Sequence, residues 1–235
     1  MYFKKLTLII FTAIILISVA CSKETTITEI NDSNALVGSG SIVSKEVLLA
    51  QFEEIVLEKN CNVELIRGTE YKASISDYSN LVQYTKLENI GSKLIIKTEP
   101  QNIILNNSKA KVIIYLPEQT LKAINILGAG NINFKSQFND ITNIAISGSG
   151  NITNEVPSVT KSLNISINGS GSVDVLKTQS QMAICDISGS GNIKLAISDI
   201  LNATILGSGN IYYQSNNNVT SITSVITGSG KVIKL

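Results

Sequence analysis

The sequence predicts an all-β protein whose folded part is a right-handed β-helix or β-solenoid, with coils of about 20 residues and Gly-Ser-Gly corners. Three observations predict this fold: a glycine motif that recurs at a nearly constant interval, an alternation of apolar and polar residues around it, and an abundance of Gly, Ser, Asn and Ile, which are weak helix formers. The motif begins at Gly128, Gly148, Gly169, Gly189, Gly207 and Gly228, so successive copies are 20, 21, 20, 18 and 21 residues apart.

The alternation predicts which residues face the interior. Ile165, Ile167, Gly169, Gly171 and Val173 share one parity, and Ser, Asn and Asp occupy the positions between them. Alternate residues of an extended chain face opposite sides, so Ile, Val and Gly are expected inside and the polar residues outside. An inward glycine suits a sharp corner or a positive φ. Coils would stack at roughly 4.8 Å, glycine over glycine; an antiparallel barrel or sandwich of short strands is the alternative.

Residues 1–20 are predicted to be a lipoprotein signal peptide. Two lysines precede an apolar run over 6–17, which is shorter than the roughly 20 apolar residues of a membrane span. Ser18-Val19-Ala20-Cys21 resembles a bacterial lipobox, in which a peptidase cuts before a cysteine that becomes diacylated. Cys21 is therefore the predicted lipid attachment site. An ordinary signal peptide with an incidental cysteine and an uncleaved anchor are the alternatives.

Residues 21–36 are predicted to be the lipidated cysteine and a flexible tether, because they are mostly polar and lack an apolar period. Two acyl chains on Cys21 suffice for stable anchoring. We therefore expect an exported protein, lipid-anchored in the bacterial cell envelope. Ser22 rather than Asp follows the cysteine, which favours the outer membrane. Periplasmic and surface-exposed orientations are both compatible with the sequence.

Residues 37–118 are predicted to form an irregular β part that continues into the regular coils of 119–235. The segment 55–65 repeats the alternation, with Lys59-Asn60-Cys61 in place of the glycine motif. Gly38-Ser39-Gly40 is interpreted as a further copy. Terminal repeats of a solenoid diverge because they cap an exposed sheet edge. Three further runs have the character of strands: 71–78, 93–98 and 111–116.

At the C-terminal end, Lys231 and Lys234 are expected to discourage pairing of the last strand with another chain, since lysine protects sheet edges.

Composition excludes several classes of function. The 235 residues carry 19 Lys and Arg against 18 Asp and Glu, a formal charge of +1, so the basic excess of a nucleic-acid-binding protein is missing. The sequence contains no histidine, which excludes Ser-His-Asp and Cys-His catalysis and His-ligated metals. With 43% hydrophobic residues the chain can fill a core.

Catalytic carboxylates on a β-solenoid would project from neighbouring coils in one column. Counted from the glycine motif that precedes each, the acidic residues of the repeat region occupy different positions, so none share a column. A strand rather than a helix follows each glycine motif, which favours a structural corner over a phosphate loop. The sequence therefore predicts no enzyme, no catalytic residue, no metal site and no cofactor.

The sequence also predicts where several asparagine, cysteine and aromatic side chains lie, inside the solenoid or on its surface. The Asn after the glycines is expected to form a ladder of stacked amides from coil to coil. Cys61 and Cys185 share the parity of inward neighbours and are predicted to be buried thiols, with a disulfide as the alternative. By parity Phe134 and Tyr213 face inward, which leaves Tyr212 as an exposed aromatic candidate.

Five features together resemble the family named putative auto-transporter adhesin, head GIN domain, over nearly all of 37–235. They are Phe52-Glu53-Glu54-Ile55, Asn62-Val63-Glu64-Leu65 with Gly68, Lys93-Leu94-Ile95-Ile96, Leu116-Pro117 and the Gly-Ser-Gly-Asn-Ile coils. The resemblance implies a β-helix-like fold in secreted or lipid-anchored proteins of Gram-negative bacteria. It carries no catalytic residues over to this chain.

We expect a non-catalytic, lipid-anchored β-solenoid of the cell envelope that presents a repetitive Ser/Asn-rich face for adhesion or ligand binding. Its expected partners are the membrane, through the lipid on Cys21, and a surface polysaccharide or a protein; no nucleic acid is expected. Weak contacts repeated along the face would act together. The alternatives are an envelope polysaccharide-processing enzyme and a structural scaffold.

Overall fold

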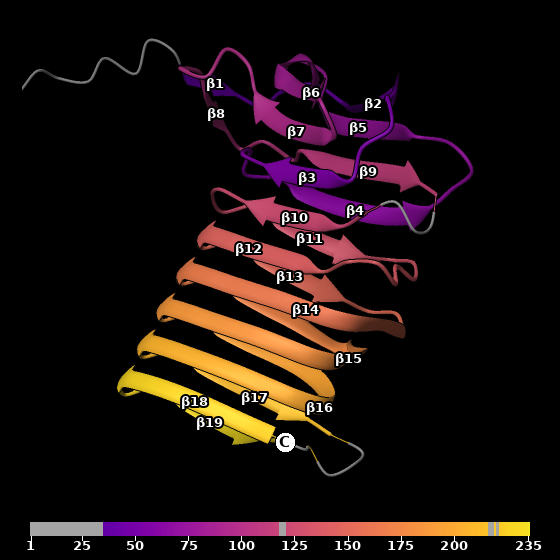
Figure 1. Cartoon of the computed structure of the whole chain (residues 1–235). Coiled ribbons are helices and arrows are strands. Elements are labelled where there is room, and N and C mark those ends of the chain that lie inside the picture. The colour runs from indigo at the N-terminus through magenta and orange to yellow at the C-terminus, as the bar shows by residue number, and fades with distance from the viewer. Residues whose placement is uncertain (1–34, 118–120, 216–218, 220) are drawn as a thin grey trace, which may run out of the picture. The chain divides into compact units, whose positions relative to one another are not determined.

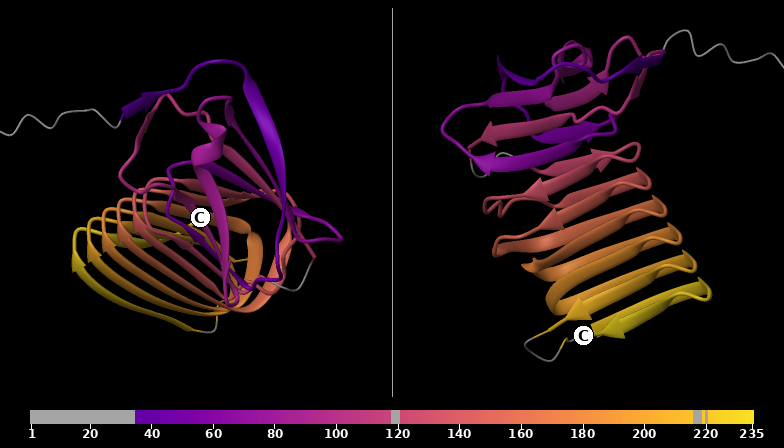
Figure 2. Two further views of the ribbon diagram at one scale, coloured as in Figure 1. Left: turned by 90° about the horizontal axis from the view of Figure 1, so that it is seen from above. Right: turned by 180° about the vertical axis from the view of Figure 1, so that it is seen from behind.

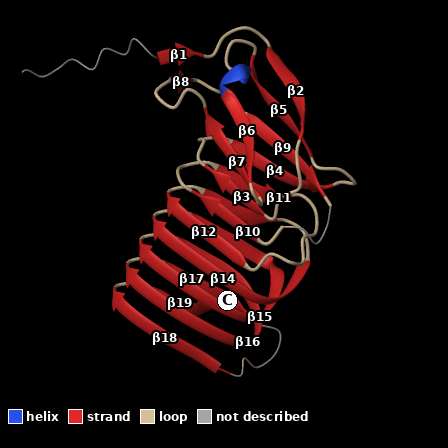
Figure 3. Cartoon of the chain, turned by 45° about the horizontal axis from the view of Figure 1, so that its top comes forward, coloured by secondary structure: helices blue, strands red, loops and turns tan. Residues whose placement is uncertain are grey.

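The computed structural model describes residues 35–117, 121–215, 219 and 221–235, and this part is built almost entirely of β-strands (Figure 1). The one helix in it is the single 3₁₀ turn η1 (Val82–Tyr84), shown in blue in Figure 3. Within these ranges no helix is both long and apolar enough to cross a membrane. The predicted signal peptide and Cys21 lie outside the described residues, and so does the predicted tether except for its last two residues, which belong to the first strand.

The N-terminal strands are β1 (Ala35–Val37), β2 (Ile42–Leu48), β3 (Glu54–Leu57), β4 (Asn62–Arg67), β5 (Lys72–Tyr78), β6 (Thr85–Ile90), β7 (Lys93–Thr98), β8 (Ile104–Asn106) and β9 (Lys111–Leu116). The later strands are β10 (Ala123–Ile126), β11 (Asn131–Phe134), β12 (Asn143–Gly148), β13 (Asn151–Asn154), β14 (Ser158–Gly169), β15 (Ser172–Gly189), β16 (Asn192–Gly207), β17 (Asn210–Gln214), β18 (Ser221–Gly228) and β19 (Lys231–Lys234).

The later strands stack as parallel coils, which confirms the β-solenoid (Figures 1 and 2). Each coil has a strand segment before the glycine corner and one after it, and each segment pairs in parallel with the equivalent segment of the neighbouring coil. β15 and β16 each run without a break from one corner to the next. Gly148 is in register with Gly169, Gly169 with Gly189, and so on to Gly228. Identical residues therefore lie above one another, as the alternation predicts.

The isoleucine positions form the core. Ile146, Ile167, Ile187 and Ile205 lie in one column and are each at most 1% exposed. Cys61 and Cys185 are buried among such apolar side chains as free thiols, which confirms the prediction. Burial raises the pKa of Cys61 to about 12 and also raises the pKa of Cys185, because a thiolate is poorly solvated there.

The corners need glycine because adjacent coils approach each other closely. Gly169 has φ +133°, and a Cβ at this position would collide with the carbonyl oxygen of Gly148. That oxygen accepts hydrogen bonds from the backbone N–H groups of Ser170 (2.9 Å) and Gly171 (3.1 Å). Both the left-handed φ and the close approach exclude larger residues. The second glycine is buried, and the first is half-buried with its missing Cβ directed at the preceding coil.

The segment 55–65 joins the stack as a coil, as its alternation predicts. β3 and β4 pair in parallel with β10 and β11, which places Lys59-Asn60-Cys61 beside the first glycine motif. A Cβ on Gly130 would lie 2.6 Å from the Lys59 carbonyl oxygen. On their other side β3 and β4 pair with β7 and β9. The coil made of β3 and β4, which comes first in the sequence, therefore lies in the stack between two coils that come later in the sequence.

Antiparallel strands cover the N-terminal end of the stack. β5 pairs in antiparallel fashion with β2 and β9, and β6 pairs with β7. The predicted strands 71–78, 93–98 and 111–116 correspond to β5, β7 and β9. These additions make 37–118 irregular, and they shield the edge of the parallel sheets, which is how solenoids protect terminal repeats.

The interpretation of Gly38-Ser39-Gly40 as a coil corner is wrong. These residues connect β1, which pairs with β8, to β2 in the antiparallel end. A Cβ on Gly38 would collide with the ring of Tyr78, and one on Gly40 with Ser79. The glycines therefore accommodate side chains of β5 and its following turn and stack on no other glycine motif.

The C-terminal end is open by contrast. In the described residues β18 pairs with β16 alone, and all eight of its residues are exposed. Lys231 and Lys234 lie on the last strand, β19, beside this edge. Their predicted role in preventing edge pairing stays a prediction.

Candidate functional site

The outward residues of the strands before the corner form one continuous surface, which we call the Ser/Asn face. It runs across β10, β12, β14 and the corner-proximal ends of β15, β16 and β18, which are hydrogen-bonded neighbours. The view from behind in Figure 2 shows the coils that carry these strands stacked one after another. The outward residues are Ala123, Asn125, Leu127, Asn143, Ala145, Ser147, Asn164, Ser166, Asn168, Ile184, Asp186, Ser188, Asn202, Thr204, Leu206, Thr223, Val225 and Thr227.

The Ser/Asn face is nearly free of charge. Asp186 is the one ionisable residue among the outward residues just named; Lys161, near the start of β14, is also exposed but lies at the end of the strand remote from the corner. The sheet after the corner carries ion pairs between neighbouring coils along its length: Lys111–Glu64 (2.9 Å), Lys135–Glu155 (2.7 Å) and Lys194–Asp174 (3.4 Å). In the sheet before the corner, the ion pair Lys93–Glu54 (3.0 Å) joins β7 to β3 and lies outside the Ser/Asn face. The hydrogen bond from Lys135 also holds the pKa of Glu155 below its ordinary value. The two faces of the solenoid are therefore chemically distinct.

Many polar groups on the Ser/Asn face are available to a ligand. Ser147, Asn168 and Ser188 lie in one column and are exposed. Within the described part of the chain, their side chains form no hydrogen bond. Each offers both a donor and an acceptor. The column repeats at the spacing of the coils, so it presents equivalent groups at regular intervals.

Apolar side chains interrupt the Ser/Asn face at several outward positions. Leu127, Leu206 and Val225 are 53%, 50% and 59% exposed, and Ile184 is 38% exposed. Single exposed apolar residues are ordinary. Here they lie on the same sheet surface as the free hydroxyl and amide groups, so the face combines apolar contact area with hydrogen-bonding groups.

The asparagines that follow the glycines have a structural role. Asn131 donates from its side-chain amide to Asn62 Oδ1 (3.0 Å), and Asn151 donates to Asn131 Oδ1 (2.9 Å). A second segment joins Asn210 to Asn192 (3.3 Å). The predicted amide ladder is thus confirmed, with Ser172 interrupting it between the two segments.

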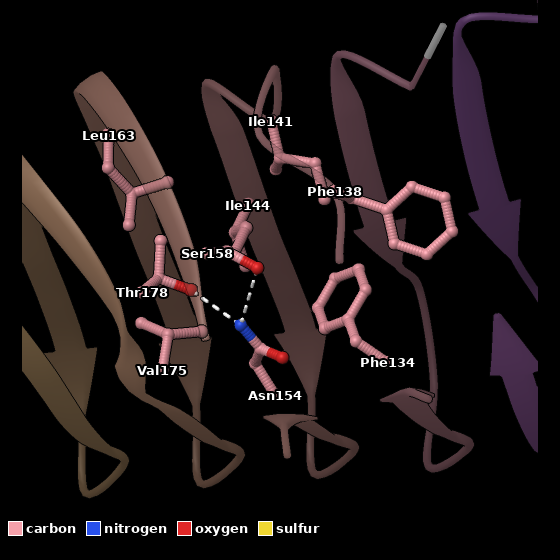
Figure 4. A pocket seen from close by; sticks show the side chains of 9 residues that line it. All are labelled: Phe134, Phe138, Ile141, Ile144, Asn154, Ser158, Leu163, Val175 and Thr178. Atoms are coloured by element: carbon pink, nitrogen blue, oxygen red, sulfur yellow. Dashed lines mark hydrogen bonds between the residues drawn. The ribbon is translucent and has the colours of Figure 1, made fainter. Parts of the chain in front are cut away.

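A small internal cavity of about 10 Å³ lies beside Phe134 and Phe138 (Figure 4). Asn154 is buried there, and its Nδ2 donates to Thr178 Oγ1 (2.7 Å) and Ser158 Oγ (3.3 Å). Its Oδ1 accepts from the backbone N–H of Val156 (2.9 Å). The space is at the lower limit for one water molecule. This buried polar cluster therefore ties coils together and has no room for a ligand.

A shallow groove of about 700 Å³ crosses the coils at the edge remote from the glycine corners. Lys122 and Asp140 form an ion pair across it (3.7 Å), and Gln179, Gln181 and Ser198 continue its polar lining. A second lysine, Lys161, also lines the groove and forms no ion pair among the described residues, so the groove is a further polar surface of the solenoid.

The predicted aromatic positions are confirmed in part. Phe134 is buried, and Tyr213 is partly buried and packs against the core. Tyr212 is half-buried instead of exposed, which weakens it as a stacking platform. Within the described ranges, no three Cys, Asp or Glu side chains gather closely enough to hold a metal ion.

The model of the family named putative auto-transporter adhesin, head GIN domain, matches residues 51–159 and 140–217. Together the two matched segments cover the chain from β3 to β17. No curated protein matches the sequence.

Three crystal structures have a similar fold. A putative adhesin from Bacteroides fragilis NCTC 9343 is 14% identical with a TM-score of 0.68, covering 85% of this chain and 100% of its own. A putative lipid binding protein from Parabacteroides distasonis ATCC 8503 is 22% identical with a TM-score of 0.55, covering 86% and 99%. A putative adhesin from Parabacteroides merdae ATCC 43184 is 17% identical with a TM-score of 0.52, covering 86% and 100%. At these identities the likeness concerns the fold.

Proposed function

The chain belongs to the family named putative auto-transporter adhesin, head GIN domain, and from this premise we propose that it is a non-catalytic binding protein of the bacterial cell envelope whose Ser/Asn face contacts a surface polysaccharide or a protein. The observation that carries the proposal is the segregation of charge. From β10 onward, the sheet after the corner carries ion pairs between coils, while the Ser/Asn face presents free hydroxyl and amide groups beside exposed apolar residues.

The proposed mechanism is multivalent. One coil offers a few hydrogen bonds, each worth about 1 kcal/mol net. Neighbouring coils repeat these groups in register, so a repetitive ligand that binds one coil is held at a high effective concentration beside the next. Affinity then depends on how many coils the ligand spans.

We further propose that a diacyl lipid on Cys21 anchors the protein to the outer membrane. The lipobox-like sequence Ser18-Val19-Ala20-Cys21 and the leader before it support this placement. The polar residues that follow would hold the solenoid away from the lipid surface. Two proteins of similar fold carry the description putative adhesin, which fits a binding role.

The proposal is tested by adding charge to the Ser/Asn face. Soluble protein from residue 22 onward contains every described strand and can be applied to whole bacterial cells and to a printed array of bacterial polysaccharides. Ser166→Lys with Ser188→Lys should lower binding at least tenfold. Thr153→Lys with Ser172→Lys adds the same charge to the opposite sheet and is the matched control.

Equal loss in both variants would point to net charge rather than to the Ser/Asn face. If neither the unmodified protein nor the variants bind cells or array, a purely structural scaffold is the better interpretation. Turnover of an array polysaccharide by the unmodified protein would instead favour the enzyme alternative.

A further inference from the structure

One corner of the solenoid departs from the pattern of the others. In the regular coils a single residue separates the two glycines. In the coil made by β7 and β9, the registers continue to Thr98 opposite Lys59 and to Ala110 opposite Cys61. The segment 99–109 therefore replaces the single residue that separates the two glycines of a regular corner. Within this segment, β8 pairs with β1. The tight corner is therefore replaced by a long excursion.

The enlarged corner explains how a lysine fits at a position that is glycine in the regular corners. Lys59 occupies the first-glycine position of the neighbouring coil. At the equivalent Gly169, a Cβ would collide with backbone stacked against it. Lys59 avoids this collision because the excursion has moved that backbone away, and it extends beside Thr98, donating from Nζ to Thr98 Oγ1 (3.1 Å).

A cavity of about 630 Å³ lies between this corner and the excursion. Its volume is within the range of small-molecule sites. Two lysines and no carboxylates line it, together with amide and hydroxyl groups, the large apolar side chains of Ile103 and Leu105, and the smaller Cys61 and Ala110. The lining residues are Lys59, Asn60, Cys61, Asn62, Thr98, Ile103, Leu105, Asn107, Ser108, Lys109, Ala110 and Asn131.

Lys59 lacks a carboxylate partner in the part of the chain that the structure describes, although it is only 4% exposed. The buried carboxylate Asp77 is already occupied, since it accepts hydrogen bonds from Ser108 Oγ (2.6 Å) and from the backbone N–H groups of Lys109 and Tyr78 (2.8 Å each). Burial lowers the pKa of Lys59 accordingly. A buried ammonium group with a single neutral partner is costly unless an anion approaches it.

We propose that this cavity binds a carboxylated sugar, with the carboxylate at Lys59 and the ring hydroxyls at the surrounding amides. The absence of lining carboxylates and the two lysines select an anion. Asn60 and Asn107 each offer an amide donor and acceptor, and Asn62 offers its Nδ2 donor, which suits vicinal hydroxyls. Asn131 also lines the cavity, but both ends of its amide already bond within the amide ladder. Ile103 and Leu105 supply apolar surface for the C–H face of a ring. This site is independent of the Ser/Asn face and of the proposed function.

Calorimetric titration of the chain from residue 22 onward tests the proposal with three probes: glucuronic acid, glucose and inorganic phosphate. Glucuronic acid should bind at least tenfold more tightly than glucose. Lys59→Met, which keeps the length of the side chain, should weaken glucuronic acid binding at least tenfold. Lys86→Met removes an exposed lysine of the same end of the molecule and should leave it unchanged.

Lys109→Gln provides a second test that leaves the buried Lys59 intact. This variant should bind glucuronic acid several-fold more weakly than the unmodified protein. Circular dichroism on each variant separates lost binding from lost folding. Equal affinity for glucose and glucuronic acid, binding of phosphate without the sugar acid, or full affinity in folded Lys59→Met would each overturn the proposal. None of these results bears on cell binding through the Ser/Asn face.

Discussion

Gly169 lies directly against Gly148 of the preceding coil, and the carbonyl oxygen of Gly148 occupies the space that a Cβ on residue 169 would need. The same contact recurs between each pair of successive coils down to Gly228. The glycine motif is therefore a stacking device: it lets the backbone of one coil hydrogen-bond to the next at the corner while the isoleucines behind it fill the core.

Gly169→Val should destabilise the fold strongly, by about 3 kcal/mol or more, because it combines a disfavoured φ with a backbone collision. Ser170→Val, at the exposed middle residue of the same corner, should change the free energy of unfolding by about 0.5 kcal/mol at most. Urea unfolding of the two variants measures the difference. Equal effects would contradict the stacking role of the glycine.

Asn154→Ala should cost about 1–3 kcal/mol, since it leaves the buried hydroxyls of Thr178 and Ser158 without their shared partner. Asn168→Ala, on the exposed Ser/Asn face, is the control and should leave unfolding almost unchanged. A neutral effect of Asn154→Ala would mean that water replaces the amide in the enlarged cavity.

The parity of the sequence predicts which side chains face inward, because it follows from the geometry of an extended chain. It also places Lys59-Asn60-Cys61 at a corner. The parity cannot predict which coils become neighbours in the stack. β3 lies between β7 and β10 and pairs with both, although β7 and β10 both follow β3 in the sequence. Long-range pairing of this kind depends on the antiparallel strands between them, which carry no repeat signal.

Gly38-Ser39-Gly40 illustrates the opposite error. Its letters match the motif, but its surroundings are antiparallel strands, and its glycines make room for Tyr78 and Ser79. The cavity beside Lys59 could not be predicted from the sequence either, because the segment 99–109 that opens it carries no repeat pattern. Its one available signal was a charged residue, Lys59, at a position that is glycine in the regular corners.

Cys61 and Cys185 should be unreactive toward a thiol reagent at pH 8 in the folded protein from residue 22 onward. Both are buried, and burial raises the pKa of each, so little thiolate forms. Two equivalents of thiol should react after denaturation. Rapid reaction of either cysteine under native conditions would show that its coil opens readily.

The raised pKa of Cys185 also predicts a dependence of stability on pH. The ordinary thiol pKa is 9.0, so the unfolded chain ionises above that pH while the buried thiol stays protonated. The stabilising contribution of the thiol is complete below pH 9 and is lost as the pH rises above it. Cys185→Ala should therefore show a shallower alkaline decline in the free energy of unfolding than the unmodified protein; parallel curves would contradict this.

Cys21→Ala should abolish incorporation of labelled fatty acid and move the protein from the membrane fraction to the soluble fraction, because the lipid is the proposed anchor. Ser22→Ala, which leaves the cysteine in place, is the control. Unchanged fractionation of Cys21→Ala would refute lipid anchoring.

The multivalent binding role is tested most directly by removing one coil. Deletion of 170–189 joins Gly169 to Ser190 and so restores a Gly-Ser-Gly corner with one coil fewer. Because each coil of a solenoid contacts only its neighbours, the shortened stack should still fold. Its avidity for whole bacterial cells should fall several-fold relative to the unmodified protein. Undiminished avidity in a folded, shortened protein would contradict binding along the repeated face.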